Sequence, residues 1–398
     1  MNQSPQKNSM DAGTIVAAAL IASAIGALFY NVLPLYLGVA QDYRGLDNKQ
    51  IGFLSSAFFL GYNVVTISAF FWIRRVSWVT IVAVATPAAA TGLYASTLFP
   101  GYLALLIITV ITGSAFAALY GLGTVILGDT SNPARWYGVK IAAEAFAGAI
   151  LLLVLPGTAI ARWGFDGAVF GIIIFVIFLS PFLFWIPKEG SKGQGAASMV
   201  ESSDLPQSIF IWGTLFATLI FFSGASAMWA FVERIGAQGG YEPKVVGILL
   251  SVTLIFALLG SILAAALGGR FGNIKPYVVG GAIFLTSLYA LNNPDVFTQY
   301  AIGACLLTLG IGFMLPFAVT EISELDIDGR YIVLSVPAIG IGAMIGPGIA
   351  GVLTQSGNFV PLLIFGAATL IISTTLLAYA GKKARHDAIA SAGVEKQV

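Results

Sequence analysis

Two charged residues inside an apolar stretch are the strongest chemical signal in this sequence. Lys140 and Glu144 lie four residues apart near the start of residues 137–160, a stretch long enough to cross a membrane. On a helix the two side chains share one face. At about 1.5 Å per residue, Glu144 lies roughly 10 Å along such a helix. A carboxylate at that depth is costly and usually lines a path for a solute or an ion.

Two interpretations of this pair stay open. In the first, Lys140 extends its long side chain to the membrane surface and pairs with Glu144 at short range, which anchors the helix. In the second, Glu144 faces a cavity and binds a proton or another cation. A carboxylate that is partly buried beside a cation can change its protonation when its surroundings change.

The composition places the chain among membrane proteins. Of its 398 residues, 58% are hydrophobic and 9% are charged, whereas about a quarter of the residues in soluble domains are charged. The apolar runs are continuous over about 20 residues, which is typical of membrane-spanning helices and not of an alternating barrel pattern. The net charge of +1 gives no reason to expect a nucleic-acid partner. The single histidine, His386, lies in the polar C-terminal tail, so we expect no cofactor, no metal site and no enzyme activity.

Twelve apolar runs predict an all-α integral membrane protein with twelve transmembrane helices. The runs cover about residues 13–40, 49–73, 78–98, 102–127, 137–160, 166–187, 208–232, 244–268, 276–292, 297–321, 331–355 and 359–381. A polar segment rich in Gly and Ser divides them six and six and predicts a flexible linker. The expected domains are therefore an N-terminal half (1–187), a cytoplasmic linker (188–207), a C-terminal half (208–381) and a cytoplasmic tail (382–398).

The positions of the basic residues predict the orientation of the chain. Most of the 19 Lys and Arg residues lie at one set of span ends, and loops rich in these residues stay in the cytoplasm. Both termini are therefore expected to be cytoplasmic. The N-terminus lacks the basic segment and short apolar core of a cleaved signal peptide. Together with the short loops, this favours a multi-pass protein of a prokaryotic inner membrane.

An internal repeat relates the two halves at a constant offset of 195 residues. "KQIGFLSS" (residues 49–56) matches "KVVGILLS" (residues 244–251). The same offset aligns Arg75 with Arg270, Asp129 with Glu324 and Arg135 with Arg330. Parallel repeats of this kind place a solute site between the halves near the membrane midplane. Glu144 aligns with Ile339 and Lys140 with Ser335, so the charged pair belongs to the first half alone. This asymmetry favours a role in coupling or binding for the pair.

With these features the sequence resembles the major facilitator superfamily over essentially its whole length. Twelve spans, the six-plus-six repeat, the central linker and the short loop between the second and third spans all fit. The loop signature of the family is altered: residues 70–78 read "FFWIRRVSW", with Arg74 where the family has an acidic residue, and residues 267–275 read "LGGRFGNIK", with Gly269 there. Residues 338–353, "AIGIGAMIGPGIAGVL", resemble the family's Gly-Pro packing motif, whose small residues let helices approach closely.

The resemblance implies a solute cavity lined by the first, fourth, seventh and tenth spans and gated by the second, fifth, eighth and eleventh. Aromatic residues in a span are commonly packing or interface anchors, but a buried amide such as Asn31 needs partners. The candidate substrate-binding residues are Tyr30, Asn31, Tyr120, Lys140, Glu144, Trp229 and Phe317, with Tyr62 and Asn63 in second place. This mixture suits an amphipathic or aromatic organic solute better than phosphate, which would require several central Arg or Lys residues.

Charged residues at the cytoplasmic span ends predict a gate made of salt bridges. Asp129 and Arg135 lie in one loop, and their repeat-related residues Glu324 and Arg330 lie in the other. The alternative is that these side chains are solvated helix ends. The candidate gate residues are Arg75, Asp129, Arg135, Arg270, Glu321, Glu324 and Arg330. On the opposite side, Glu233 and Arg234 are expected to form a surface pair.

These observations predict a secondary transporter that moves a small organic solute by alternating access, with proton coupling through Glu144. The expected partners are the solute, a proton and membrane lipid, and we expect a monomer. An uncoupled facilitator and a lipid translocase are the nearest alternatives. A polytopic membrane enzyme or a sensor is the alternative from another class. No nucleotide-binding loop of the Gly-x-x-x-x-Gly-Lys-Ser/Thr type occurs in the sequence, so ATP is not expected to drive transport directly.

Overall fold

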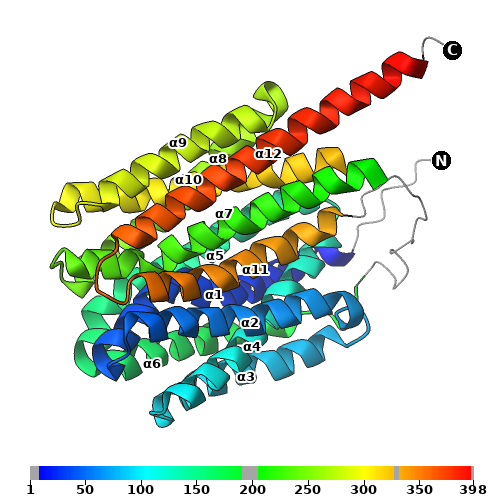
Figure 1. Cartoon of the computed structure of the whole chain (residues 1–398). Coiled ribbons are helices and arrows are strands. Elements are labelled where there is room, and N and C mark those ends of the chain that lie inside the picture. The colour runs from blue at the N-terminus through cyan, green and yellow to red at the C-terminus, as the bar shows by residue number, and fades with distance from the viewer. Residues whose placement is uncertain (1–8, 191–204, 327–330, 396–398) are drawn as a thin grey trace. The chain divides into compact units, whose positions relative to one another are not determined.

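The computed structural model describes residues 9–190, 205–326 and 331–395, and every element in these ranges is a helix. Long apolar stretches favour this outcome, because a backbone surrounded by lipid must satisfy its hydrogen bonds internally. Figure 1 follows the helices in chain order, from blue at the N-terminus to red at the C-terminus.

Six α-helices form the N-terminal part of the chain. They are α1 (Gly13–Arg44), α2 (Asn48–Trp72), α3 (Trp78–Leu98), α4 (Tyr102–Gly128), α5 (Pro133–Val154) and α6 (Ala161–Leu179). Short helical turns accompany them at η1 (Ser9–Asp11), η2 (Pro156–Ile160) and η3 (Ser180–Trp185).

Six further α-helices form the C-terminal part. They are α7 (Leu205–Gln238), α8 (Pro243–Leu267), α9 (Ile274–Leu291), α10 (Phe297–Leu325), α11 (Ser335–Leu353) and α12 (Val360–Glu395), with short turns at η4 (Gly268–Phe271) and η5 (Ile332–Leu334).

Eleven helical stretches among the described residues are long and apolar enough to cross a membrane. One of them, Arg135–Trp185, is 51 residues long. It contains both α5 and α6, so it corresponds to two of the predicted spans. The predicted fold class, an all-α membrane protein with two six-helix halves, is confirmed.

A glycine breaks this long stretch into two helices. Gly164 has a φ of 54°, a left-handed conformation that residues with a side chain rarely adopt. The ring of Tyr43 at the end of α1 lies where a side chain of residue 164 would be. Pro156 opens the π-helical turn η2 just before the break. The change of direction explains how one continuous apolar stretch supplies two helices.

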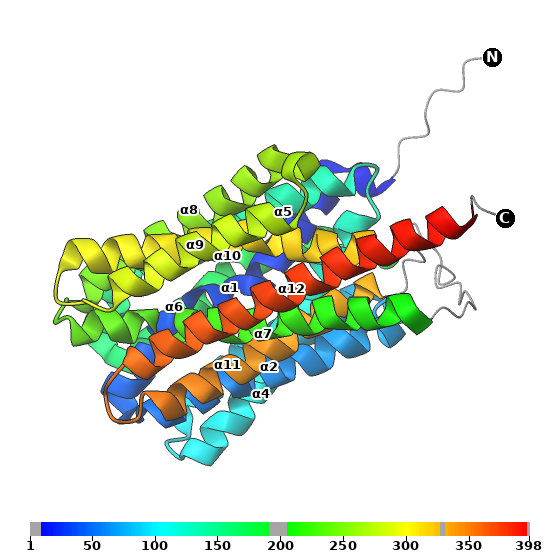
Figure 2. The ribbon, with the colours of Figure 1, turned by 45° about the horizontal axis from the view of Figure 1, so that its top comes forward.

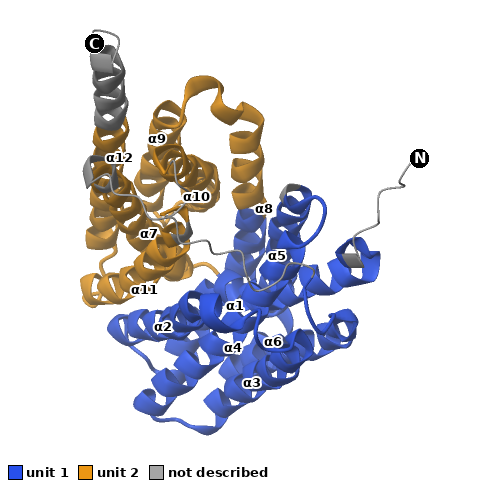
Figure 3. Ribbon diagram, turned by 90° about the vertical axis from the view of Figure 1, so that its right-hand side faces the viewer, with its two compact units in different colours: residues 1–198, 242–254 blue, residues 199–241, 255–398 orange. Residues whose placement is uncertain are grey.

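The chain forms two compact units, shown in different colours in Figure 3. The first consists of Met1–Ser198 and Glu242–Leu254, and the second of Met199–Tyr241 and Ile255–Val398. The N-terminal half of α8 thus belongs to the first unit, where its Leu254 lies against α5 at Gly148. The domain boundaries at residues 187, 207 and 381 stay a prediction.

Helices pack in the same order inside each unit. In the first, α1 packs against α4, α5 and α6, and α3 packs against α4 and α6. In the second, α7 packs against α10, α11 and α12, and α9 packs against α10 and α12. Figure 2 shows α7 running between α11 and α12. Each of these five relations in the first unit has its counterpart six helices later in the second, as the sequence repeat predicts.

One helix pair in each unit is joined by the same kind of contact. Ser114 Oγ of α4 donates to the carbonyl oxygen of Gly61 in α2 at 3.2 Å, and Ser261 Oγ of α8 donates to that of Gly312 in α10 at 3.2 Å. Glycine is required at both places, because a Cβ would lie 1.9 Å from the Val110 carbonyl oxygen in the first and 2.2 Å from that of Ala257 in the second. The backbones of these helices therefore touch directly.

Candidate functional site

Lys140 and Glu144 form an ion pair inside the first unit. The Lys140 Nζ lies 2.7 Å from Glu144 Oε1, and the two side chains are 6% and 13% exposed. The pair follows from the four-residue spacing on α5, which stacks the two side chains one turn apart. The expectation that Lys140 extends to the membrane surface is wrong. Its ammonium group turns inward, toward the ring of Tyr120 on α4.

The ring of Tyr120 on α4 contacts the Lys140 ammonium group. The Lys140 Nζ lies 3.9 Å from the ring centre, a distance at which the negative face of an aromatic ring attracts a cation. A second ring, that of Tyr62 on α2, lies 5.8 Å from the Tyr120 ring. The ammonium group is thus shared between a carboxylate and an aromatic face.

Residues of α1 hold Glu144 from two sides. The Ser23 hydroxyl donates a short hydrogen bond to Glu144 Oε1, and Asn31 Nδ2 donates to the Glu144 backbone carbonyl oxygen at 2.9 Å. The Asn31 side chain therefore satisfies its need for a partner while it ties α1 to α5. These contacts limit the movement of the carboxylate relative to α1.

Close helix contacts position the parts of this site. A Cβ on Gly26 of α1 would lie 2.4 Å from the backbone nitrogen of Tyr120, and one on Gly148 of α5 would lie 2.5 Å from Asn31 Cβ. Real Cβ atoms do not approach so closely, so only glycine lets α4 and α5 lie this near to α1. We call the group of Ser23, Tyr120, Lys140 and Glu144 the α1/α4/α5 cluster.

Three other predicted substrate-binding residues are aromatic side chains with contacts of their own. Tyr30 packs its ring edge-on against Phe59, with ring centres 5.8 Å apart. Trp229 of α7 is 4% exposed, and Phe317 of α10 is 4% exposed and packs against another phenylalanine of its helix. Both belong to the second unit. Tyr30, Asn31, Tyr120, Lys140 and Glu144 are thus the predicted residues that belong to the first unit.

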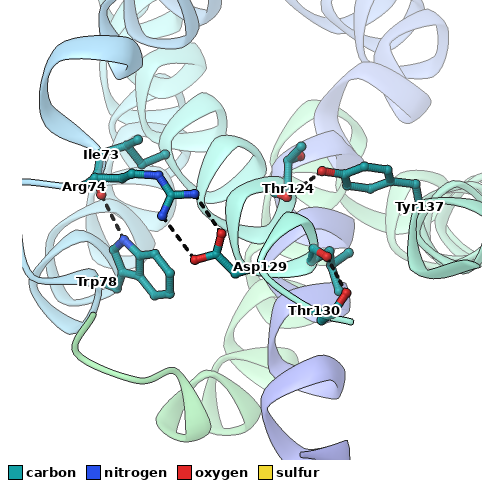
Figure 4. Close-up of polar contacts among 8 residues, drawn as sticks. Ile73, Arg74, Trp78, Thr124, Asp129, Thr130 and Tyr137 are labelled. Carbon is teal, nitrogen blue, oxygen red and sulfur yellow. Dashed lines mark hydrogen bonds and ion pairs between the residues drawn. The ribbon is translucent and has the colours of Figure 1, made fainter. Parts of the chain in front are cut away.

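A second ion pair joins the loop between α2 and α3 to the end of α4. Figure 4 shows the Arg74 guanidinium and the Asp129 carboxylate in a two-fold contact, with Nη2 to Oδ1 at 2.8 Å and Nη1 to Oδ2 at 3.1 Å. The Asp129 side chain is 0% exposed and that of Arg74 is 32% exposed. Hydrogen bonding to Asp129 raises the pKa of the Arg74 guanidinium above its ordinary value. The Arg74 guanidinium therefore keeps its positive charge beside Asp129.

Arg135, the gate candidate in the same loop as Asp129, contacts an aromatic ring. Arg135 is exposed, and its guanidinium lies 5.0 Å from the ring centre of its neighbour Trp136. Arg74 is nearer to Asp129 because the α2–α3 loop folds against the end of α4, where the Trp78 indole donates to the Ile73 carbonyl oxygen at 2.8 Å.

The remaining gate candidates differ in their surroundings. Arg75, Arg270 and Glu324 are exposed, and Arg330 lies outside the described residues. Glu321 is 0% exposed and accepts a hydrogen bond from Asn273 Nδ2 at 2.8 Å. It thus links α10 to the first residues before α9. A gate formed by these residues stays a prediction.

Glu233 and Arg234 near the end of α7 are buried, so the expected surface pair is wrong. They are 4% and 7% exposed. The guanidinium contacts both carboxylate oxygens, with Arg234 Nη2 to Glu233 Oε1 at 2.8 Å. Neighbouring residues on a helix can pair in this way because both side chains are long. The pair is buried because α7 packs against α10, α11 and α12.

The chain is thus a helical membrane protein built of two equivalent six-helix parts. Residues 214–397 match the family model of the Major Facilitator Superfamily. No curated protein sequence matches the chain significantly.

Solved structures extend this likeness to nearly the whole chain. A bacterial homologue of the human lysosomal transporter Spinster, inward-facing and unoccupied, aligns with a TM-score of 0.66 and 14% identity over 95% of this chain and 97% of its own. The nucleoside transporter NupG aligns with a TM-score of 0.67 and 13% identity over 94% and 99%. A bacterial homologue of the iron transporter ferroportin, inward-facing, gives 0.64 and 15% over 92% and 98%. The chain has the major facilitator fold, and the predicted resemblance to this superfamily is confirmed.

Sequence reasoning missed two members of these sites. Ser23 was not a candidate, because a serine among small residues of a span carries no signal of its own. Its partner Glu144 lies 121 residues away. Arg74 was named as a departure from the family's loop signature but was not among the candidate gate residues. The available signal was the sign of its charge, which is opposite to that of Asp129 at the end of α4.

Proposed function

We propose that this protein is a secondary transporter. It moves a small amphipathic or aromatic organic solute across a membrane by alternating access and couples this movement to protons through Glu144. The observation that supports the proposal is the buried contact of Lys140, Glu144 and Tyr120 inside apolar helices. Intramembrane ionisable residues are rare and mark solute or ion paths. The similar structures are described as transporters of different substrates, so the fold does not select the solute.

The chemistry of the pair suggests how coupling works. Lys140 and the Ser23 hydroxyl stabilise the ionised form of Glu144. If the pair separates during the transport cycle, the carboxylate loses its counter-charge in an environment of low polarity. It then takes up a proton, since an isolated buried carboxylate is costly to keep ionised. When the pair forms again, the proton leaves.

The proposal includes the membrane arrangement expected from the sequence. The protein spans a prokaryotic inner membrane as a monomer with both termini in the cytoplasm. The cytoplasmic gate includes Arg75, Arg135, Arg270, Glu321, Glu324 and Arg330. The contact of Arg74 with Asp129 holds the α2–α3 loop against the end of α4.

Proteoliposomes with an imposed pH gradient test this function. Three radiolabelled probes of one size differ only in charge: phenylpropylammonium, phenylpropanol and phenylpropanoate. Passive permeation of the probes is the same in vesicles with the wild-type protein and in vesicles with Glu144→Gln. The difference between the two uptake rates therefore measures transport that depends on Glu144. Glu242→Gln is the matched control, since Glu242 is an exposed carboxylate before α8.

Each outcome of this experiment distinguishes the alternatives. We expect gradient-dependent movement of at least one probe in the wild type and in Glu242→Gln, but not in Glu144→Gln. Transport that ignores the gradient would favour an uncoupled facilitator. No transport of any probe would favour a lipid translocase, a sensor or an enzyme. Among the described residues, no three His, Cys, Asp or Glu side chains gather in a way that could hold a metal ion for such an enzyme.

A further inference from the structure

The Lys140 ammonium lies in surroundings that would recognise a cation from any source. Its Nζ lies 2.7 Å from Glu144 Oε1 and 3.9 Å from the centre of the Tyr120 ring. A carboxylate beside an aromatic face is the combination that binds ammonium ions in proteins. The ring of Tyr62, 5.8 Å from that of Tyr120, adds a second aromatic surface. Lys140 therefore stands where the ammonium group of a ligand would bind.

The other members of the α1/α4/α5 cluster are held more firmly than Lys140. Ser23 and Asn31 bind the side chain and the backbone of Glu144, and the close contact of Gly26 fixes the backbone of Tyr120. Lys140 is attached through a flexible four-carbon stem. It also lies one turn nearer the start of α5, from where such a side chain can reach the membrane surface. When it turns away, the carboxylate and the ring remain in place.

We propose that Lys140 is a tethered competitor for the binding site of an organic ammonium ion. The transported solute is then an amine or quaternary ammonium compound with an aromatic or apolar body. Its cationic group replaces the Lys140 ammonium between Glu144 and Tyr120, and its body contacts the ring of Tyr62. This inference rests on the proposed transport function and names the class of its solute.

An anionic solute would have to use the cluster in the opposite way. It would bind Lys140 and displace Glu144, which is the member that Ser23 and Asn31 hold. Displacement would leave a carboxylate without its counter-charge in a largely buried position, which is strongly unfavourable. The solute anion would also face the negative surface of the Tyr120 ring. The geometry therefore favours a cation.

The sequence repeat agrees with a single site of this kind. The positions in α11 equivalent to Lys140 and Glu144 hold Ser335 and Ile339. Ser335 is 6% exposed, and its hydroxyl donates to the Ile332 carbonyl oxygen within its own segment. The second unit therefore has no matching pair at the equivalent place, and the cluster serves a role that common packing of the halves does not require.

Calorimetric binding to the purified full-length protein in detergent tests this assignment. The probes are phenylpropylammonium, phenylpropanol and phenylpropanoate, which share one aromatic body. We expect the ammonium ion to bind the wild type at least about tenfold more tightly than the alcohol, as a charge-assisted contact requires. The carboxylate is expected to bind no better than the alcohol.

Variants assign the contacts one at a time. Glu144→Gln should weaken ammonium binding by about tenfold. Tyr120→Leu should weaken it by about fivefold while Tyr120→Phe, which keeps the aromatic face, should not. Lys140→Met should tighten it by at least about fivefold, because the site no longer has an internal occupant to displace. Lys275→Met, at an exposed position of α9, is the control and should bind as the wild type does.

A double variant is the control for misfolding of Lys140→Met. Lys140→Met leaves Glu144 without its cation, which can destabilise the protein. The double variant Lys140→Met/Glu144→Gln has no charge to compensate, so it should remain a monodisperse species and bind the ammonium ion no better than the alcohol. The two Tyr120 variants change no charge at all. They keep the assignment testable if Lys140→Met does not fold.

Two results would overturn the assignment. One is tighter binding of phenylpropanoate than of phenylpropylammonium, with loss of that binding in Lys140→Met. The other is equal binding of the ammonium ion and the alcohol by the folded wild type and by the Tyr120 variants. Failure of the proposed function looks different: ammonium binding would follow the expected order of variants, but transport in proteoliposomes would not respond to a pH gradient.

Discussion

Removal of the Arg74 guanidinium is expected to weaken the cytoplasmic end of the first unit. Arg74→Gln deletes two charge-assisted hydrogen bonds, at 2.8 and 3.1 Å, and leaves a carboxylate that is 0% exposed. Each such bond contributes about 1.5–3 kcal/mol. The Arg74 side chain is 32% exposed, so solvent screens part of this energy. We therefore expect a loss of about 2 kcal/mol in the free energy of unfolding, near the lower end of that range.

Unfolding in mixed detergent micelles, followed by tryptophan fluorescence, measures this loss. Trp78 is 1% exposed and packs beside the ion pair, so it reports on the same region. Arg75→Gln is the matched control, because Arg75 is an exposed neighbour of the same type and should cost less than about 0.5 kcal/mol. Asp129→Asn completes a double-mutant cycle, in which we expect a coupling energy of about 1–2 kcal/mol.

Two results would contradict the role of this ion pair. Equal losses for Arg74→Gln and Arg75→Gln would show that the pair does not stabilise the loop. A coupling energy indistinguishable from zero would show that Arg74 and Asp129 act independently, and the reasoning from their geometry would be wrong.

Three further predictions concern packing and hydrogen bonding. Gly26→Ala places a Cβ 2.4 Å from the Tyr120 backbone and should destabilise the protein by about 1–3 kcal/mol. Its control, Gly138→Ala on α5, has open space and should be neutral or stabilising by up to about 1 kcal/mol. Equal free energies of unfolding for the two variants would refute the close helix contact. Asn273→Ala removes a donor to the buried Glu321 carboxylate and should lower the free energy of unfolding by about 1–3 kcal/mol. Its control, Asn292→Ala at the exposed end of α9, should change it little. Similar free energies of unfolding for the two variants would argue against that hydrogen bond. Ser23→Ala removes the hydroxyl that donates to Glu144, so gradient-driven transport in proteoliposomes should be slower than in the wild type. An unchanged transport rate would contradict this role.

The helices could be predicted from the sequence because a backbone surrounded by lipid must form its hydrogen bonds internally. Continuous apolar runs must become helices, and the twelve predicted runs correspond to α1–α12. A break between residues 160 and 166 was predicted, but the positive φ of Gly164 was not, since a glycine among apolar residues does not reveal its backbone conformation. The start of α5 at Pro133 lies four residues before the predicted start, where Asn132 caps the helix and so extends it beyond the apolar run.

The site was predictable only where its members are close in sequence. The spacing of Lys140 and Glu144 on one helix is sufficient to predict their contact. The contributions of Ser23 and Tyr120 depend on how α1, α4 and α5 pack, and no local pattern encodes that packing. The same holds for the contact of Asp129 with Arg74, which depends on the fold of the α2–α3 loop. The buried state of Glu233 and Arg234 likewise follows from the helices that surround α7.

The most direct test of the central claim is proton-gradient-driven transport by Glu144→Gln in proteoliposomes, measured with the three phenylpropyl probes beside the wild type and Glu242→Gln. We predict that the wild type and Glu242→Gln move a probe in response to the gradient and that Glu144→Gln does not. A response to the gradient that is as large in Glu144→Gln as in the wild type would contradict the role of Glu144 in coupling.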